Sequence, residues 1–195
     1  MKTNTRKLTD TAILIAMGTV LSIFKVDLPF GGGVTACSML PLVILSFRYG
    51  WKWGGLAGLT YSLLQLLLGL DNVQYASSAL MAAGVVVLDY LLAYTVIGFA
   101  SFFGGKPGNT RKALIIGIVV TFLLRLVCHY ITGVWIWGEW MPEEFMGMAM
   151  TSPWLYSFLY NGWYMLAEII LTVAAAMAIY GPLKKYIHGE DLKQQ

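Results

Sequence analysis

Charged residues are scarce in this sequence. Asp, Glu, Lys and Arg together make up 12% of its 195 residues, whereas a soluble globular domain carries about 25%. A disordered chain is excluded, because disorder requires high charge and low hydrophobicity. A water-soluble monomer is also disfavoured, since 58% of the residues are hydrophobic and the mean hydropathy is +0.69. The composition predicts an all-α integral membrane protein with one domain, residues 1–195.

The sequence also lacks the motifs of several kinds of chemistry. Its two cysteines, Cys37 and Cys128, lie far apart in apolar segments, so neither a disulfide framework nor a C-x-x-C pair is expected. The zinc motif H-E-x-x-H and the nucleophile motif G-x-S-x-G are missing. The string Gly104-Gly105-Lys106-Pro107 lacks the spacing and the hydroxyl of a P-loop. We therefore expect no metal site, no cofactor, no ATP hydrolysis and no enzymatic activity.

Long apolar runs dominate the chain instead, and a bilayer-spanning helix needs about 20 such residues. The six runs are Leu8 to Phe24, Cys37 to Phe47, Trp51 to Gly69, Ala79 to Phe103, Ala113 to Val134 and Trp154 to Tyr180. The second run is too short for a full span, so we expect it to be tilted or partly re-entrant. The pattern predicts six transmembrane helices.

The charges between these runs predict their orientation. Alternate segments carry the basic residues: Lys2, Arg6 and Lys7, then Arg48 and Lys52, then Lys106, Arg111 and Lys112, and finally Lys184, Lys185 and Lys193. The intervening segments carry acidic residues, with Lys25 as their one basic residue. Because cytoplasmic loops are enriched in Lys and Arg, both termini are predicted to be cytoplasmic in a multi-pass protein of the cell membrane.

A few polar residues interrupt the apolar runs, where a charged group costs several kcal/mol and is a functional candidate by default. They are Asp89, Arg125, His129, Asn161 and Glu168. At 1.5 Å per residue, Asp89 and Arg125 lie about 15 Å from the outer ends of their helices, and His129 lies about 8 Å from its end. Polar groups from three helices thus share the outer half of the membrane. This distribution predicts a cavity that opens outward.

The fifth run presents one polar stripe, because Arg125, His129 and Thr132 follow at i, i+4 and i+7. Gly133 leaves room on the His129 side. The loop after it and the sixth run supply aromatic residues: Trp135, Trp137, Trp140, Trp154, Tyr156, Tyr160, Trp163 and Tyr164. Aromatic faces beside a carboxylate suit an organic cation or a flat heterocycle.

Plainer interpretations stay open for each feature. Aromatic residues near helix ends commonly form an interfacial belt. Asp89 and Arg125 could be a buried ion pair that holds two helices together. Glu168, which lies deeper, is expected to make a structural hydrogen bond.

These positions carry a resemblance to a known family. The segment Arg125–Glu139 (RLVCHYITGVWIWGE), followed by Tyr156, Asn161 and their neighbours, resembles the thiamine-specific S-component of energy-coupling factor (ECF) vitamin transporters. The resemblance covers nearly the whole chain. It implies a six-helix bundle that holds the vitamin near the extracellular face, under the loop between the first two helices.

The resemblance also assigns residues to thiamine binding: Asp89, Tyr90, Arg125, His129, Gly133, Trp137, Tyr156 and Asn161. It implies polar contacts from Asp89 and His129, ring stacking by Trp137 and tyrosines, and a hydrogen bond from Asn161 to the pyrimidine. Best-known members have glutamate and lysine in place of Asp89 and Arg125. A tryptophan expected in the first outer loop is missing, and Phe30 is its only aromatic residue.

A transporter of this kind needs partners, since the chain has no P-loop of its own. The resemblance implies a membrane-embedded coupling subunit and two ATPases, with Ala12 and Ala16 as an A-x-x-x-A docking motif. Small residues four apart let helices approach closely, yet they are equally suited to contacts within the chain. Two alternatives remain: an S-component for another flat vitamin or a thiamine precursor, and an intramembrane enzyme that uses Asp89, His129 and Glu168.

Overall fold

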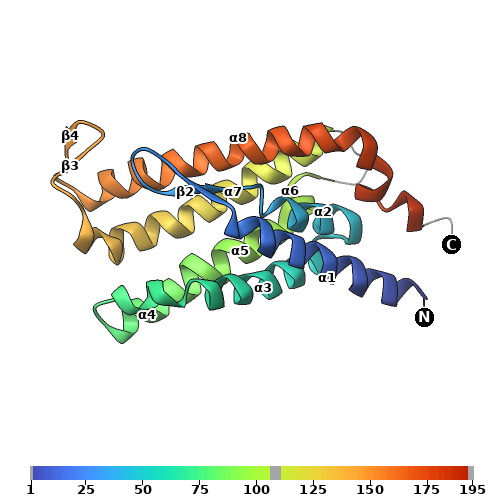
Figure 1. Cartoon of the computed structure of the whole chain (residues 1–195), viewed down its shortest axis with the longest axis horizontal. Helices are drawn as coiled ribbons and strands as arrows, with labels where there is room; N and C mark the ends of the chain where they lie inside the picture. The colour runs from blue at the N-terminus through green and yellow to red at the C-terminus, as the bar shows by residue number, and fades with distance from the viewer. Residues whose placement is uncertain (1, 106–110, 193–195) are drawn as a thin grey trace.

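A computed structural model describes residues 2–105 and 111–192 of the chain (Figure 1). Lys106, Pro107 and Lys193, which entered the loop and charge predictions, lie outside these residues. The helices run side by side along one long axis, and both chain ends lie at the same end of the bundle. The longer helices are α1 (Lys2–Ile23), α2 (Leu40–Tyr49), α3 (Trp51–Leu68), α7 (Arg111–Trp135) and α8 (Pro153–Ile187).

The fourth apolar run is helical throughout but irregular. It comprises α4 (Ala79–Gly84), the π-helix η2 (Val85–Leu92), α5 (Ala93–Thr95), the 3-10 helix η3 (Val96–Phe99) and α6 (Ala100–Phe103). Three further short 3-10 helices are η1 (Leu70–Tyr75), η4 (Trp137–Trp140) and η5 (Glu190–Leu192). A π-helix is rare and concentrates at functional sites. Here it carries Asp89 and Tyr90.

The prediction of a helical membrane protein is confirmed. Each of the six apolar runs forms helix, and three segments are long and apolar enough to cross a membrane: Ala79–Phe103, Arg111–Trp135 and Pro153–Leu192. The count of six spans and the cytoplasmic placement of both termini stay predictions.

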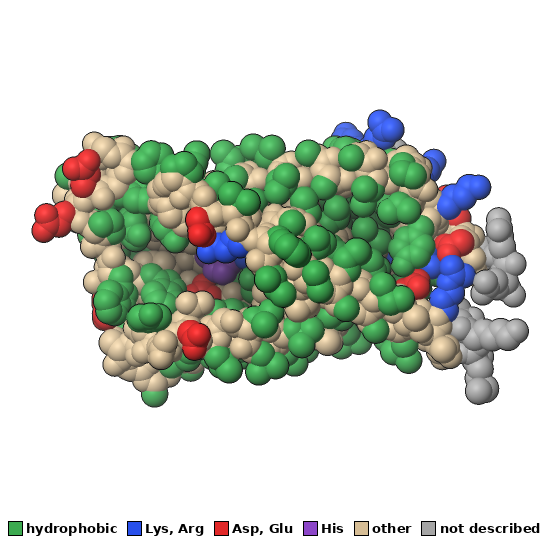
Figure 2. All heavy atoms as spheres, in the orientation of Figure 1, with side chains coloured by type: hydrophobic (Ala, Val, Ile, Leu, Met, Phe, Trp, Pro, Cys, Tyr) green, Lys and Arg blue, Asp and Glu red, His purple; other side chains and the backbone are tan. Residues whose placement is uncertain are grey.

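The short second run has a physical explanation. In α2, every residue from Leu40 to Arg48 is buried, and Leu42, Val43 and Leu45 are completely enclosed. The helix therefore packs against the other helices on all sides. Apolar side chains on the outer helices, such as Leu63 and Leu67 on α3 and Ile170 on α8, are exposed. An apolar band of this kind around the bundle suits lipid contact, and Figure 2 shows it on one face.

Two short antiparallel hairpins join the helices, and the sequence did not predict them. The first pairs β1 (Lys25–Asp27) with β2 (Gly33–Thr35), and the second pairs β3 (Glu144–Phe145) with β4 (Met148–Ala149). The turn of the first hairpin uses Gly31 and Gly32 at φ +85° and +71°, a left-handed conformation that favours glycine.

The two ends of the bundle differ in charge. Basic side chains gather at the end that holds the termini, and acidic ones mark the opposite end (Figure 2). At the basic end, the fully buried guanidinium of Arg48 contacts Asp10 at 2.8 Å and Asp191 at 2.7 Å. Arg6 also pairs with Asp191. These ion pairs tie α1, α2 and η5 together.

Candidate functional site

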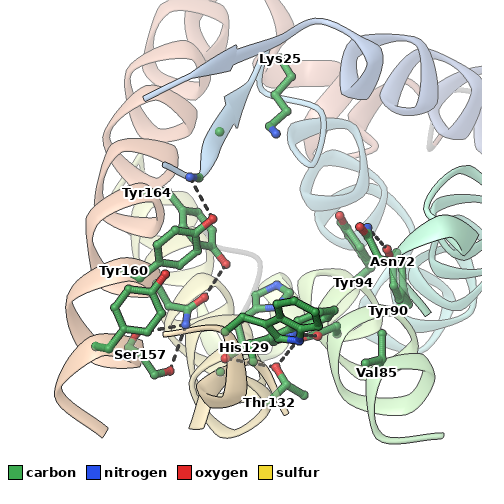
Figure 3. Close-up of a pocket in the computed structure, with 18 residues that line it drawn as sticks. Lys25, Asn72, Val85, Tyr90, Tyr94, His129, Thr132, Ser157, Tyr160 and Tyr164 are labelled. Carbon is green, nitrogen blue, oxygen red and sulfur yellow. Dashed lines mark hydrogen bonds and ion pairs between the residues drawn. The ribbon is translucent and has the colours of Figure 1, made fainter. Parts of the chain in front are cut away.

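A cavity of about 490 Å³ lies toward the acidic end of the bundle, where Figure 2 shows a hollow in the side of the molecule. It is lined by the first hairpin, η1, η2, α5, α7, η4 and α8. Its lining residues, drawn in Figure 3, are Lys25, Gly32, Gly33, Asn72, Val85, Asp89, Tyr90, Tyr94, His129, Thr132, Gly133, Trp137, Trp140, Tyr156, Ser157, Tyr160, Asn161 and Tyr164.

The carboxylate of Asp89 is the centre of the polar contacts. Its Oδ2 accepts a hydrogen bond from Trp137 Nε1 at 3.0 Å, and its Oδ1 lies 2.8 Å from His129 Nδ1. The hydroxyl of Thr132 donates to the same Oδ1. Three donors from α7 and η4 thus converge on one side chain of the π-helix. They hold the acid in a fixed orientation at the wall of the cavity.

His129 keeps one ring nitrogen available. Since Nδ1 faces the carboxylate, we assign the proton of the neutral ring to Nδ1, which leaves Nε2 as an acceptor. Nε2 is buried and has no hydrogen-bond partner among the described residues. A buried polar atom without a partner is costly. It is suited to a donor group of a ligand in the cavity.

The α8 wall supplies an amide and hydroxyls. Asn161 Nδ2 donates to Ser157 O at 3.0 Å, and its Oδ1 accepts from Tyr164 OH at 3.0 Å. Ser157 in turn donates to the Tyr130 carbonyl on α7 at 2.9 Å. A Cβ at Gly133 would lie 2.2 Å from Ser157 Oγ and 2.8 Å from Asn161 Nδ2. Gly133 therefore makes room for these two α8 side chains. The sequence analysis had expected the space on the side of His129.

Aromatic rings cover much of the remaining wall. Tyr160 and Tyr164 lie on one side in Figure 3, and Tyr90 and Tyr94 lie opposite them. Of the tryptophans expected around the ligand, Trp137 and Trp140 line the cavity. The other three, Trp135, Trp154 and Trp163, are outside its lining, with exposed fractions of 43%, 61% and 37%. Only part of the predicted aromatic cage thus faces the cavity.

The first hairpin is fastened to α8 at both of its ends. At its turn, the Gly32 N–H donates to Tyr160 OH at 3.0 Å, and the Phe30 ring lies 6.2 Å from Phe145 of the second hairpin. At its base, Glu168 Oε1 accepts from the Thr35 N–H and hydroxyl, at 3.0 and 2.9 Å. The structural hydrogen bond expected of Glu168 is confirmed.

Arg125 does not join the other predicted residues. It lines an adjoining cavity of about 460 Å³, where Nη1 lies 3.0 Å from Met39 Sδ and the guanidinium lies over the Tyr94 ring. Asp89 pairs with His129 and not with Arg125, so the ion-pair alternative for Asp89 and Arg125 is wrong. The other seven predicted residues, namely Asp89, Tyr90, His129, Gly133, Trp137, Tyr156 and Asn161, all line the main cavity.

The sequence analysis missed several lining residues that lie between the apolar runs. Lys25 comes from β1 and Asn72 from η1, and Asn72 Nδ2 donates to Tyr90 OH at 2.8 Å. A polar residue between apolar runs can stay in water and is not conspicuous, whereas one inside an apolar run is costly to bury and therefore stands out.

The residues expected to dock a partner, Ala12 and Ala16, are exposed on α1. Within the described residues, no group of three His, Cys, Asp or Glu side chains is placed to hold a metal ion.

Comparison with known families identifies the chain's relatives. The model of the family described as "Thiamine transporter protein (Thia_YuaJ)" matches residues 8–187. The chain belongs to this thiamine transporter family. It is 30% identical over 177 residues to "Thiamine transporter ThiT" of Bacillus subtilis (strain 168), with 85% of each chain covered. It is 28% identical over 177 residues to the protein of that name from Lacticaseibacillus paracasei, with 84% of this chain and 81% of the relative covered.

A solved structure supports the fold. The structure of ThiT from Listeria monocytogenes superposes with a TM-score of 0.74 and covers 95% of this chain and 98% of its own, at 23% identity. Membership of the thiamine transporter family agrees with the apolar helices, so the protein is a multi-pass membrane protein. The relatives are transporters and not enzymes.

Proposed function

We propose that this member of the thiamine transporter family binds thiamine in the 490 Å³ cavity and serves as the substrate-binding S-component of an ATP-driven importer. The observation that carries the proposal is the Asp89 carboxylate, oriented by His129, Thr132 and Trp137 in a cavity lined with aromatic rings. Thiamine carries a fixed positive charge on its thiazolium ring. A cation of this kind is stabilised by a nearby carboxylate and by aromatic faces.

The rest of the wall matches the second ring of thiamine. An aminopyrimidine presents both donors and acceptors, and Asn161 carries both types on one amide. His129 Nε2, which has no hydrogen-bond partner among the described residues, adds an acceptor for the amino group of the pyrimidine. Tyr156, Tyr160 and Tyr164 of α8 offer rings for stacking on the same side of the cavity.

Transport requires an energy source, and the sequence has no P-loop with which to hydrolyse ATP. We propose that a membrane-embedded coupling subunit and two ATPases supply it. Ala12 and Ala16 on α1 are the proposed docking contact. Both are exposed together with their apolar neighbours Ile13 and Met17, which is compatible with close approach of a partner helix.

Titration of the purified protein with thiamine, followed by tryptophan fluorescence, tests the binding claim. Trp137 and Trp140 line the cavity, so we expect saturable quenching at submicromolar thiamine. The absence of any change at high micromolar thiamine, in protein that is still folded, would refute the assignment. Competition with a free aminopyrimidine or another flat vitamin then separates thiamine from the alternative cargoes, since the tightest competitor identifies the ligand.

A further inference from the structure

A group of exposed aromatic side chains lies near the basic end of the bundle, outside the lining of both cavities. The ring of Trp51, at the start of α3, lies 5.5 Å from the ring of Phe102, and Phe102 lies 5.1 Å from Phe103 at the end of α6. Their exposed fractions are 39%, 58% and 37%. These three residues are called the aromatic patch below.

A close contact between two backbones brings the aromatic patch together. A Cβ at Gly54 of α3 would lie 2.2 Å from the carbonyl oxygen of Gly98, and a Cβ at Gly98 of η3 would lie 2.0 Å from that of Gly54. Only glycine permits so close an approach. Trp51 precedes Gly54 by about one helical turn, and Phe102 follows Gly98 by about one turn. The fold therefore fixes the positions from which both rings project.

Two lysines lie beside the aromatic patch. The ammonium group of Lys52 lies 5.5 Å from the centre of the Trp51 ring. Lys112, near the start of α7, is exposed and follows the end of α6 closely in space, because a Cβ at Gly104 would lie 2.4 Å from the Ala113 carbonyl oxygen. Neither lysine lies within 4.0 Å of a carboxylate in the part of the chain that the structure describes. Their positive charges are available to a partner.

The surroundings of the aromatic patch favour a lipid as this partner. Leu56 and Leu59 of α3 and Ile116 of α7 are exposed next along these helices, so the patch continues into the apolar band around the bundle. Aromatic rings at the end of such a band lie at the level of the lipid headgroups, and lysine side chains extend from there toward the phosphates. The basic end, seen in Figure 2, is the predicted cytoplasmic end, and the cytoplasmic leaflet carries anionic lipids.

We propose that the aromatic patch, Lys52 and Lys112 form a binding site for an anionic phospholipid. The two lysines contact its phosphate, and its glycerol and upper acyl chains cover the three rings. The site lies outside the ligand cavity and does not depend on the proposed function. An acidic protein partner would match the lysines, but it would not account for rings that continue into the lipid-facing surface.

The test measures quenching of Trp51 by spin-labelled lipids, with the purified full-length chain in phosphatidylcholine bilayers. Phosphatidylglycerol and phosphatidylcholine carry the same nitroxide near the glycerol end of one acyl chain. The Trp51 signal is the difference between a protein and its Trp51→Phe counterpart. We expect phosphatidylglycerol to associate about tenfold more strongly than phosphatidylcholine at this site, since lysines near an anionic lipid each add several-fold to the association.

The double variant Lys52→Gln/Lys112→Gln should lower this preference to less than about twofold. Lys184→Gln/Lys185→Gln is the matched control, because it removes two exposed charges from the same end of the bundle, on α8, and it should keep the preference. Both single variants, Lys52→Gln and Lys112→Gln, are measured as well, so that the comparison survives if the double variant is unstable.

Three results would overturn the proposal. A preference below about twofold in the intact protein would leave the aromatic patch to a protein partner. An unchanged preference in the variants of Lys52 and Lys112 would place the lipid elsewhere. An equal loss in the α8 control would show a general attraction between the basic end and anionic lipids, without a site at the aromatic patch.

Discussion

Among individual residues, Asp89 makes the sharpest prediction. Asn at this position keeps the size of the side chain but loses the negative charge. In Asp89, one carboxylate oxygen accepts from Trp137 and the other faces His129. The amide of Asn has a single acceptor oxygen, and its NH2 group would face one of these two donors. Hydrogen bonds to charged groups contribute about 1.5–3 kcal/mol each. We expect Asp89→Asn to weaken thiamine binding about ten- to a hundredfold, measured by fluorescence titration or calorimetry.

The matched control for this prediction is Asp71→Asn. Asp71 is exposed on η1, outside the lining of both cavities, so the same chemical change should leave the dissociation constant within about twofold. Equal affinity in Asp89→Asn and the unmodified protein would contradict the central role of the carboxylate.

The sequence predicted the residues of the site unevenly, for a physical reason. Asp89, His129 and Asn161 interrupt apolar runs, where a polar group is costly and therefore conspicuous. Lys25 and Asn72 lie between the apolar runs, where polar residues are common, and only the folded chain brings them to the cavity. Arg125 was found by the same cost argument. Its place in the second cavity depends on side-chain direction, which spacing along one helix does not determine.

At the scale of elements, the contact between α7 and α8 depends on Gly133. A methyl group there would overlap Ser157 Oγ and crowd Asn161 Nδ2, and overpacking costs about 1–3 kcal/mol. We expect Gly133→Ala to lower the thermal midpoint by several degrees and to weaken thiamine binding, because Asn161 would move.

Gly162→Ala is the matched control on α8. Apart from its chain neighbours and the adjacent backbone of its own helix, no described residue lies within 4 Å of a Cβ built at Gly162. Alanine is favoured over glycine inside a helix by up to about 1 kcal/mol. This variant should be as stable as the unmodified protein or slightly more stable. A thermal scan of both variants decides the question, and equal midpoints would contradict the close contact at Gly133.

The first hairpin makes a kinetic prediction. Tyr160→Phe removes the hydroxyl that accepts the Gly32 N–H, and a hydrogen bond contributes about 1 kcal/mol. Since this hairpin covers the cavity, we expect thiamine to dissociate about fivefold faster in stopped-flow displacement. Tyr130→Phe on α7, outside the cavity lining, should leave the rate unchanged. Identical dissociation in Tyr160→Phe would show that the hairpin contact does not retain the ligand.

Sequence patterns predicted the helices better than their details. Apolar runs located each helical segment to within a few residues, apart from ends that extend beyond the apolar region, such as Lys2–Ile23 and Pro153–Ile187. They could not reveal the π-helix at Val85–Leu92, since hydropathy is the same for both helix types. The hairpins were missed because strands of two or three residues are too short for a period. Both hairpins are held in place by contacts with α8 that lie far apart in the sequence.

For the molecule as a whole, the proposed function requires that one end binds the ligand while another surface contacts the proposed partner. The cavity lies toward the acidic end, and the Arg48 ion pairs fasten α1 to α2 and η5 at the other. This division agrees with the predicted orientation, in which the basic end is cytoplasmic. The proposed docking residues Ala12 and Ala16 lie near the middle of α1, on its exposed side.

The docking proposal makes the last prediction. Leucines at both Ala12 and Ala16 would hold a partner helix away from α1 but would not reach the cavity, so thiamine binding should persist while uptake into cells is lost. The chain offers a close control: Ala174 and Ala178 form a second exposed A-x-x-x-A pair, on α8. The same double change there adds equal apolar bulk to an exposed helix face. It should leave uptake intact, because the proposed partner contacts α1 and not α8. Loss of uptake in the α8 variant but not in the α1 variant would move the docking surface to α8. Small residues four apart are common in membrane helices, so only this comparison can assign the partner to one of the two faces.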